Sequence, residues 1–225
     1  MSAMRLALFD LDGTLLHGDS DHAFGEFVIA RGWADAAAHR ARNDAFYADY
    51  AAGRLDIHAY VDFATHAWRD RPADELAHAS QAFLAAYVLP MITAEARALV
   101  ERHRAAGDQL ALVTATNDFV TRPIAGLFGI ETLIATELER DASGRVLGRI
   151  RGTPAFREGK IDRVTQWLAA QGRTLADYER CTFYSDSTND LPLLEHVSHP
   201  VATNPGPALA RIAQERGWPV LKLHP

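Results

Sequence analysis

The sequence is poor in the features of secreted and membrane proteins. It has one cysteine, Cys181, among 225 residues, so no intrachain disulfide can form and a reducing compartment is compatible. No stretch approaches the ~18 consecutive apolar residues of a membrane span. Asp10 and Asp12 interrupt the apolar N-terminal run, which therefore does not resemble a signal peptide. We expect a cytoplasmic protein with no membrane partner.

Lysine is scarce as well, because only two of the 23 basic residues are lysines, Lys160 and Lys222. The 29 acidic residues outnumber the basic ones and leave a formal net charge of −6 at pH 7. This charge argues against a nucleic-acid partner, which would favour a basic surface. Small anionic substrates remain compatible, because they respond to the local field of a binding site. Because nearly all basic residues of this chain are arginines, the lysine at position 160 indicates a candidate functional role for its ammonium group.

The most informative stretch is RLALFDLDGT, residues 5–14. Its apolar residues 6–9 predict a strand that is buried on both faces. Asp10 and Asp12 follow, and side chains two residues apart in an extended chain point to the same side. Both carboxylates should therefore face one crevice at the carboxyl end of the strand, where open α/β sheets bind ligands. Gly13 permits a tight turn after them. The alternative interpretation is that Asp10 and Asp12 only form an acidic turn that has no function.

A helical region follows the first strand. Its clearest segment places Ile57, Tyr60, Val61, Ala64 and Trp68 on one face of a helix. We predict four short helices, at residues 20–31, 35–52, 57–68 and 72–87. Because strands are predicted on both sides of this region, it is interpreted as a small helical bundle inserted into an α/β domain.

Strands and helices alternate after Pro90. We predict helices at 93–106, near 118–127 and from Lys160, strands at 109–113, 131–139, 181–185, 200–203 and 219–223, and a hairpin over 137–151 that turns at 142–144. This alternation predicts an α/β fold with a doubly wound, mostly parallel sheet and helices on both faces.

Polar residues follow several of these strands. Thr114 and Asn117 come after the strand at 109–113, and Asp186 and Asp190 come after the strand at 181–185. If a helix starts at Asp186, the two aspartates lie about one turn apart and face the same crevice. Structural alternatives exist for each: a helix cap for Thr114, a solvated first-turn position for Lys160, and a favourable helix dipole for the aspartates.

The order of these residues resembles the haloacid dehalogenase-like superfamily of phosphatases, whose motifs appear here as DLDGT, the threonine of VTATN, a lysine and SDSTND. The residues that carry the resemblance are Asp10, Asp12, Thr114, Lys160, Asp186 and Asp190. The helical insertion is similar to the cap of subfamily IB, which contains the phosphoserine phosphatases. The resemblance implies a Rossmann-like core of residues 1–16 and 89–225 and a helical cap of residues 17–88.

The family implies a mechanism. Asp10 would attack phosphorus to give an aspartyl-phosphate that water hydrolyses. Asp12 would protonate the leaving oxygen and then deprotonate the water. Thr114 and Lys160 would hold the phosphoryl oxygens, and Asn117 would take part in binding the substrate or its phosphate.

A cofactor follows from the charge of this set. Four aspartates against one lysine are hostile to a phosphate dianion, and Mg²⁺ suits hard oxygen ligands. By resemblance, the metal ligands are Asp10, the backbone carbonyl of Asp12, and Asp186, with Asp190 behind them.

Two departures from the phosphoserine phosphatase pattern bear on the substrate. The second motif has Thr114-Ala115-Thr116-Asn117 where a Ser-Gly-Gly type is usual, and Ser185 stands where glycine is common. These side chains reshape the pocket beside the phosphate. The chain is also similar to histidinol-phosphate phosphatases, so we expect a small phosphomonoester that bears an amine, such as histidinol phosphate or phosphoserine. Asp19 and Asp21 could pair with the amine; solvated loop acids are the alternative.

Two other functions stay open. A phosphotransferase of the same fold would pass the phosphoryl group to another alcohol. A receiver-type signalling module would accept one phosphoryl group without turnover, but such modules are usually half this length and have no helical bundle after the first strand. For the enzyme we expect a monomer or homodimer acting on a small molecule.

Overall fold

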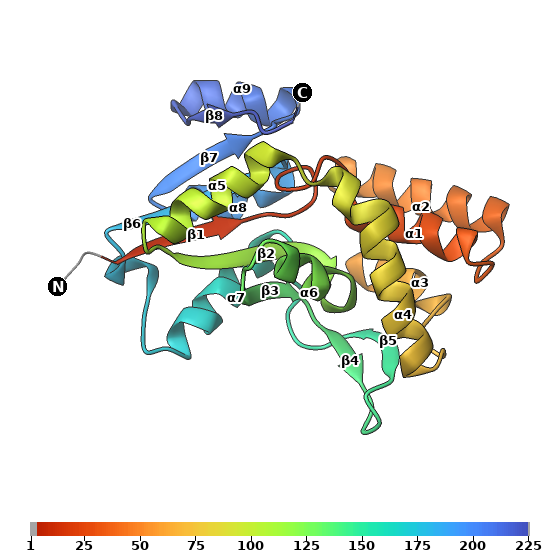
Figure 1. Cartoon of the computed structure of the whole chain (residues 1–225). Coiled ribbons are helices and arrows are strands. Elements are labelled where there is room, and N and C mark those ends of the chain that lie inside the picture. Colours follow the sequence, from red (N-terminus) through yellow and green to blue (C-terminus); the bar gives the residue numbers. More distant parts are fainter. Residues whose placement is uncertain (1–3, 225) are drawn as a thin grey trace.

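A six-stranded parallel sheet lies at the centre of the structure, a computed structural model that describes residues 4–224 (Figure 1). The strand order is β3-β2-β1-β6-β7-β8. The strands are β1 (Arg5–Phe9), β2 (Gln109–Asn117), β3 (Thr132–Thr136), β6 (Arg180–Ser185), β7 (His199–Thr203) and β8 (Val220–Leu221). Every neighbouring pair is parallel, which confirms the predicted sheet.

Strand β1 occupies the position at which the strand order reverses. From β1 the chain builds β2 and β3 on one side and later adds β6, β7 and β8 on the other. Ligands of open α/β sheets bind outside the carboxyl ends of the strands at such a switch point. The residue that follows β1 there is Asp10.

Helices cover both faces of the sheet. Alternate residues of β1 point to opposite faces, so each face has its own hydrophobic cluster. Ala7 and Phe9 pack into one hydrophobic cluster, and Leu6 and Leu8 pack into the other. The first cluster includes buried residues of α5 (Ala94–Ala105) and α6 (Asp118–Leu127); the second includes those of α7 (Glu158–Ala169), α8 (Leu191–His196) and α9 (Pro207–Arg216). The doubly wound α/β prediction is confirmed.

Four helices connect β1 to α5 and β2 and lie together beyond the carboxyl end of β1 (Figure 1). They are α1 (Ser20–Ala30), α2 (Ala36–Ala51), α3 (Ile57–His66) and α4 (Ala73–Phe83), all within a few residues of the predicted ranges. Asp19, Asp35 and Asp56 cap the first three through side chains that accept backbone N–H groups. Phe24 and Phe83 meet edge to face with ring centroids 4.9 Å apart, so these helices have an aromatic core.

The helical group ends in a widened turn. After α4, residues Leu84–Val88 form a π-helix and Leu89–Met91 a 3₁₀-helix that leads to α5. The predicted fourth helix over 72–87 therefore consists of a regular part and a π-helical part. Trp68 of the group stacks on Phe119 of α6 with ring centroids 4.2 Å apart, which joins the helices to the sheet domain.

The prediction of one strand over 131–139 is wrong. Strand β3 stops at Thr136, and the next residues form β4 (Leu138–Arg140), which pairs with β5 (Val146–Ile150) in a separate antiparallel hairpin. The chain turns away from β2 at this point, where the Asp118 carboxylate accepts a hydrogen bond from the Leu138 N–H at 3.1 Å. The predicted hairpin itself is confirmed.

No helix within residues 4–224 combines the length and the apolar character that spanning a membrane requires.

Candidate active site

The site is built around the carboxyl end of β1. The Asp10 N–H donates to the Tyr184 carbonyl at 2.9 Å, which continues the β1–β6 pairing to the residue after the strand. The chain then turns at Gly13, whose φ of +69° favours glycine. A Cβ at position 13 would lie 2.2 Å from Oδ2 of Asp186, so the close approach of that carboxylate also requires glycine.

Lys160 joins two aspartates from different loops. Its Nζ donates to Asp10 Oδ1 at 2.9 Å and to Asp190 Oδ2 at 2.7 Å, and all three side chains are buried. Burial by itself would lower the pKa of Lys160, but the two carboxylates outweigh it and hold that pKa above its ordinary value. Burial raises the pKa of Asp10 well above its ordinary value, although Lys160 opposes the shift. The ammonium is therefore a fixed positive charge beside Asp10.

Asp186 and Asp190 do not share an α-helix. The loop after β6 passes through a 3₁₀ turn at Thr188–Asp190, and α8 begins only at Leu191. Thr14 Oγ1 donates to Asp186 Oδ1 at 3.0 Å. Burial, with Asp190 as the next cause, raises the pKa of Asp186 to about 7. The segment between β6 and α8 thus brings both aspartates to the end of β1, where Asp186 contacts Thr14 and Asp190 contacts Lys160.

The carboxylate of Asp12 points toward the helical group. Its Oδ1 accepts the Ser20 N–H at 2.6 Å, and its Oδ2 accepts the Thr116 hydroxyl at 2.9 Å. Desolvation, followed by the nearby Asp19 carboxylate, raises the pKa of Asp12 to about 7. An acid with that pKa can both give and take a proton near neutral pH.

Thr114 and Thr116 lie on β2, which extends to Asn117 rather than ending at residue 113. Thr114 is 1% exposed, and its hydroxyl accepts the Thr116 N–H at 3.2 Å. Sequence reasoning missed Thr116, although alternation along a longer strand places it on the same side as Thr114.

Asn204 was also missed; its Nδ2 donates to the carbonyl oxygens of Gly13 at 2.8 Å and Thr14 at 3.1 Å. It follows β7, so a polar residue after another strand was the available signal. These two bonds hold the turn that carries the DLDGT motif.

Asn117 and the two aspartates of the first helix lie on the far side of Asp12. Asn117 caps α6 through its Oδ1, and its Nδ2 donates to Asp21 Oδ1 at 3.3 Å. Asp19 caps α1 by accepting the His22 N–H at 2.7 Å. Asp21 is buried, and burial raises its pKa to about 8. Asp21 is therefore not a solvated loop acid.

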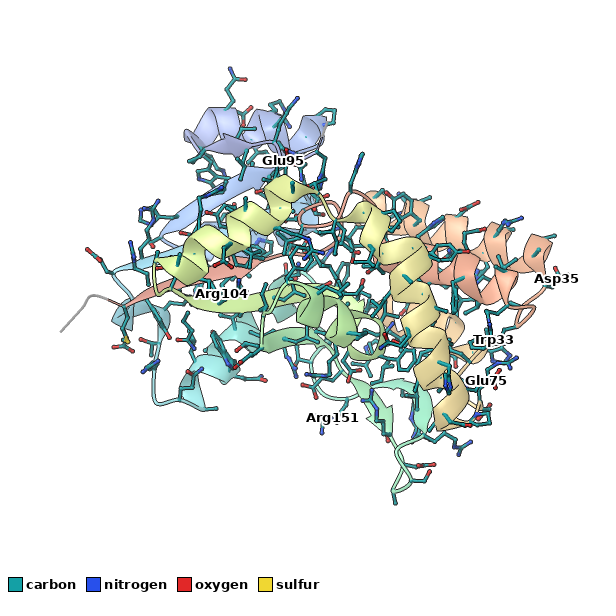
Figure 2. All side chains as sticks on the ribbon, viewed as in Figure 1. Trp33, Asp35, Glu75, Glu95, Arg104 and Arg151 are labelled. Carbon is teal, nitrogen blue, oxygen red and sulfur yellow. The ribbon has the colours of Figure 1, made fainter. Side chains whose placement is uncertain are left out.

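One cavity connects these groups. Asp10, Asp12 and the threonines of β2 line it from the sheet, and residues of the helical group line it from the other side, among them Asp19, Asp21, Phe46, Tyr47, Tyr50 and Tyr60. Tyr50 lies near Asp10 and Ser187. None of the acids labelled in Figure 2 lines it; Asp35, for example, lies at the outer end of the helical group. The cavity thus brings most of the predicted residues together at the sheet edge.

Comparisons with known proteins agree with this arrangement. A family model described as haloacid dehalogenase-like hydrolase matches residues 7–195. The histidinol-phosphatase of Neisseria meningitidis serogroup C (strain 8013) is 47% identical over 217 residues, which cover 96% of this chain and 98% of the relative.

Solved structures agree on the fold. A protein with unknown function from Bordetella pertussis Tohama I has a TM-score of 0.93 and 48% identity, with 99% of this chain and 100% of that chain covered. A substrate-bound phosphoserine phosphatase has a TM-score of 0.69 at 16% identity, covering 98% of this chain and 94% of that chain, and supports the fold alone. The chain therefore belongs to the haloacid dehalogenase-like hydrolases, and the predicted phosphatase class is confirmed.

Proposed function

We propose that this phosphatase is a Mg²⁺-dependent phosphomonoester hydrolase that works through an aspartyl-phosphate on Asp10. The observation that carries the proposal is the buried contact of Asp10 with Lys160, at 2.9 Å, at the end of the central strand and in the cavity that Asp12 shares. A nucleophile, a fixed cation and a second acid then converge at one sheet edge. The receiver-type alternative has no support in the family match, which is to a hydrolase.

The donor set fits a magnesium ion. No group of three or more His, Cys, Asp and Glu side chains forms a metal cluster within residues 4–224. The Asp190 carboxylate is engaged by Lys160, and the Asp12 carboxylate by Ser20 and Thr116. Asp10 and Asp186 each have one carboxylate oxygen engaged, by Lys160 and by Thr14, and would offer the other oxygen to the ion together with the backbone carbonyl of Asp12. Such hard oxygen donors suit Mg²⁺, which keeps several waters and binds through one or two carboxylates. The bound ion would supply positive charge against the substrate phosphate.

The residues of the chain divide the remaining work. Asp10 attacks the phosphorus atom, while Lys160 and Thr114 hold phosphoryl oxygens and stabilise the charge of the transition state. Asp190 orients Lys160. Asp12 protonates the leaving oxygen and later accepts a proton from the attacking water, which its pKa of about 7 supports.

We propose that Asn117 orients Asp21. Its amide nitrogen donates to Asp21, and its amide oxygen accepts the Val120 N–H, so both polar groups of this side chain are already engaged.

We also propose that residues 17–88 form a cap over a core of residues 1–16 and 89–225. The cavity lies between the sheet edge and these helices, and residues of both line it. Movement of the helices away from the sheet would widen it for a phosphorylated metabolite. The contacts that hold them in place include two hydrogen bonds from the catalytic loops: Asn189 Nδ2 donates to the Tyr50 carbonyl at 3.0 Å, and the Arg157 guanidinium donates to the Gly53 carbonyl.

These contacts tie the cap to the catalytic loops. Asn189 precedes Asp190, and Arg157 precedes α7, whose Lys160 N–H donates to the Arg157 carbonyl at 3.0 Å. Arg157 has a φ of +53°, a conformation that costs a non-glycine residue energy and persists only where surrounding contacts hold it. Closure of the cap would exclude water while the aspartyl-phosphate forms.

The substrate is proposed to be a small phosphomonoester of an amino alcohol. The 47% identical relative is named histidinol-phosphatase, and Asp19 and Asp21 line the cavity beyond the phosphate end. A phosphotransferase reaction differs only in the second acceptor and is distinguished by product analysis.

The test measures release of inorganic phosphate from an aryl phosphate. Activity should disappear on exhaustive chelation, return with Mg²⁺, and be absent in Asp10→Asn, which also should not trap a phosphoryl group. Full activity after chelation, or a phosphorylated Asp10→Asn protein, would contradict the proposal. Transfer of phosphate to an added alcohol at the expense of free phosphate would support the phosphotransferase instead.

A further inference from the structure

The cavity is acidic along its whole length. Four aspartates, at positions 10, 12, 19 and 21, line it, and the described lining residues include no arginine or lysine. The proposed chemistry uses Asp10 and Asp12 at the phosphate end. Asp19 and Asp21 lie at the leaving-group end, and the proposed reaction gives neither of them a step. Asp19 caps α1 and Asp21 accepts a hydrogen bond from Asn117, but neither contact neutralises a carboxylate, and a cationic ligand would.

The walls of the leaving-group end are aromatic. Phe46, Tyr47 and Tyr60 line it from α2 and α3, whereas Tyr50 lies near Asp10 and Ser187. Phe46 and Tyr60 meet edge to face with ring centroids 5.3 Å apart, which fixes the orientation of both rings. The faces of aromatic rings carry negative potential and attract cations within about 6 Å. Arg42 already lies over the Phe46 ring, 4.4 Å from its centroid. Aromatic rings and carboxylates both favour a positively charged ligand.

Asp21 is held in a defined position within this end. Asn117 Nδ2 donates to its Oδ1 at 3.3 Å, and the Tyr60 hydroxyl lies close enough to lower the pKa of its carboxyl group. Burial works in the opposite direction and is the larger effect, so that pKa is about 8. A bound cation would keep the carboxylate ionised, whereas a second anion would meet repulsion from Asp19 and Asp21.

From this arrangement we infer that the enzyme selects phosphate esters whose leaving group carries an ammonium and no carboxylate, and that Asp21 is the selecting residue. The inference rests on the proposed phosphatase function and narrows it. Within the amino-alcohol phosphates it excludes amino-acid phosphates such as phosphoserine as good substrates. The described lining residues include no arginine or lysine to meet their carboxylate, and the one histidine among them, His22, lies 3.1 Å from Asp44 Oδ1.

Three small substrates test the inference on the unmodified enzyme. O-Phosphoethanolamine and O-phosphoserine differ only in the carboxylate, and ethyl phosphate lacks the amine. We expect kcat/KM for phosphoethanolamine to exceed both others, and to exceed that of phosphoserine by about 100-fold, because like charges brought together at a binding site cost several kcal/mol. Equal kcat/KM values for phosphoethanolamine and phosphoserine would overturn the inference.

A pair of matched variants assigns the effect to Asp21. Asp21→Asn removes the charge with little change in shape, and should lower the phosphoethanolamine to ethyl phosphate ratio by about tenfold while raising phosphoserine relative to phosphoethanolamine. Asp35→Asn is the control, because Asp35 is exposed, lies outside the cavity, and is replaced by an equally good helix cap. Unchanged ratios in Asp21→Asn, or equal changes in both variants, would contradict the role of Asp21.

Failure of the inference can be distinguished from failure of the proposed function. If the Mg²⁺-dependent hydrolysis of an aryl phosphate is present but phosphoserine is the best of the three substrates, only the inference is wrong. If no ester releases phosphate with Mg²⁺, the proposed function is wrong and the inference falls with it.

Discussion

Replacing Lys160 by methionine should destabilise the protein strongly at neutral pH and much less in acid. The Nζ of Lys160 is shared by two buried carboxylates, at 2.9 Å from Asp10 Oδ1 and 2.7 Å from Asp190 Oδ2. Methionine keeps much of the side-chain length but leaves both carboxylates without a counter-ion. Removal of one partner from a buried ion pair costs roughly 3–5 kcal/mol.

The deficit depends on pH because the Asp10 carboxyl group, left without its counter-ion, can take up a proton. Burial already holds the pKa of Asp10 above its ordinary value while Lys160 opposes the shift, so the pKa rises further in the variant. A carboxyl group whose pKa is raised in the folded state makes the folded protein less stable as the pH rises above the group's unfolded-state pKa of about 4. The difference in unfolding free energy from the wild type should therefore be small near that pH and grow as the pH rises toward neutral.

Thermal unfolding measures the effect. For a chain of this length, ~1 kcal/mol corresponds to a shift in Tm of about 2–4 °C, so Lys160→Met should melt about 6–20 °C below the wild type at pH 7.5. A chelator must be present, because a bound cation would replace the missing charge. Lys222→Met is the control, since Lys222 is exposed and surface substitutions change stability by only about 0.5 kcal/mol. Equal melting of Lys160→Met and wild type at pH 7.5, or the same deficit at pH 4.5, would refute the reasoning.

Three further predictions concern the motif, the turn and the cap. Asp12→Asn should lower kcat by ~10²- to 10⁴-fold, because it removes the proton donor and acceptor; single-turnover kinetics with unchanged rates would contradict this. Gly13→Ala should raise the Mg²⁺ concentration needed for half-maximal activity, because its Cβ would lie 2.2 Å from a carboxylate oxygen of Asp186; an unchanged Mg²⁺ titration would show that the turn tolerates alanine. Arg157→Ala should increase hydrogen exchange around Gly53, because it removes the contact between α7 and the cap; exchange equal to the wild type would mean that this contact does not hold the cap closed.

Local patterns were sufficient where local physics decides the structure. The apolar run at residues 6–9 predicted β1, because a strand that is buried on both faces has no polar side to show. Amphipathic spacing predicted α1 to α3 within a few residues of their observed ends. The motifs predicted the family, since their order along the chain is preserved whatever the loops between them do.

Patterns failed where a distant residue decides the local conformation. Residues 131–139 have the composition of one strand, but the Asp118 carboxylate binds the Leu138 N–H and the chain leaves the sheet there. β2 continues through polar residues to Asn117, which pairs with Thr136 of β3 after a register shift between Val113 and Asn117. A single-sequence pattern contains no information about either partner.

The sequence by itself determined the sheet, the helical insertion and the residue types that meet at the end of β1. These follow from periodicity and from the rule that parallel strands end at a common edge. Only the tertiary structure decided how the acids are divided: Asp190 pairs with Lys160, Asp12 with Thr116, and Asp21 with Asn117. The partners in each pair are separated by 30, 104 and 96 residues, and such distances are closed by packing of the whole chain rather than by local preference.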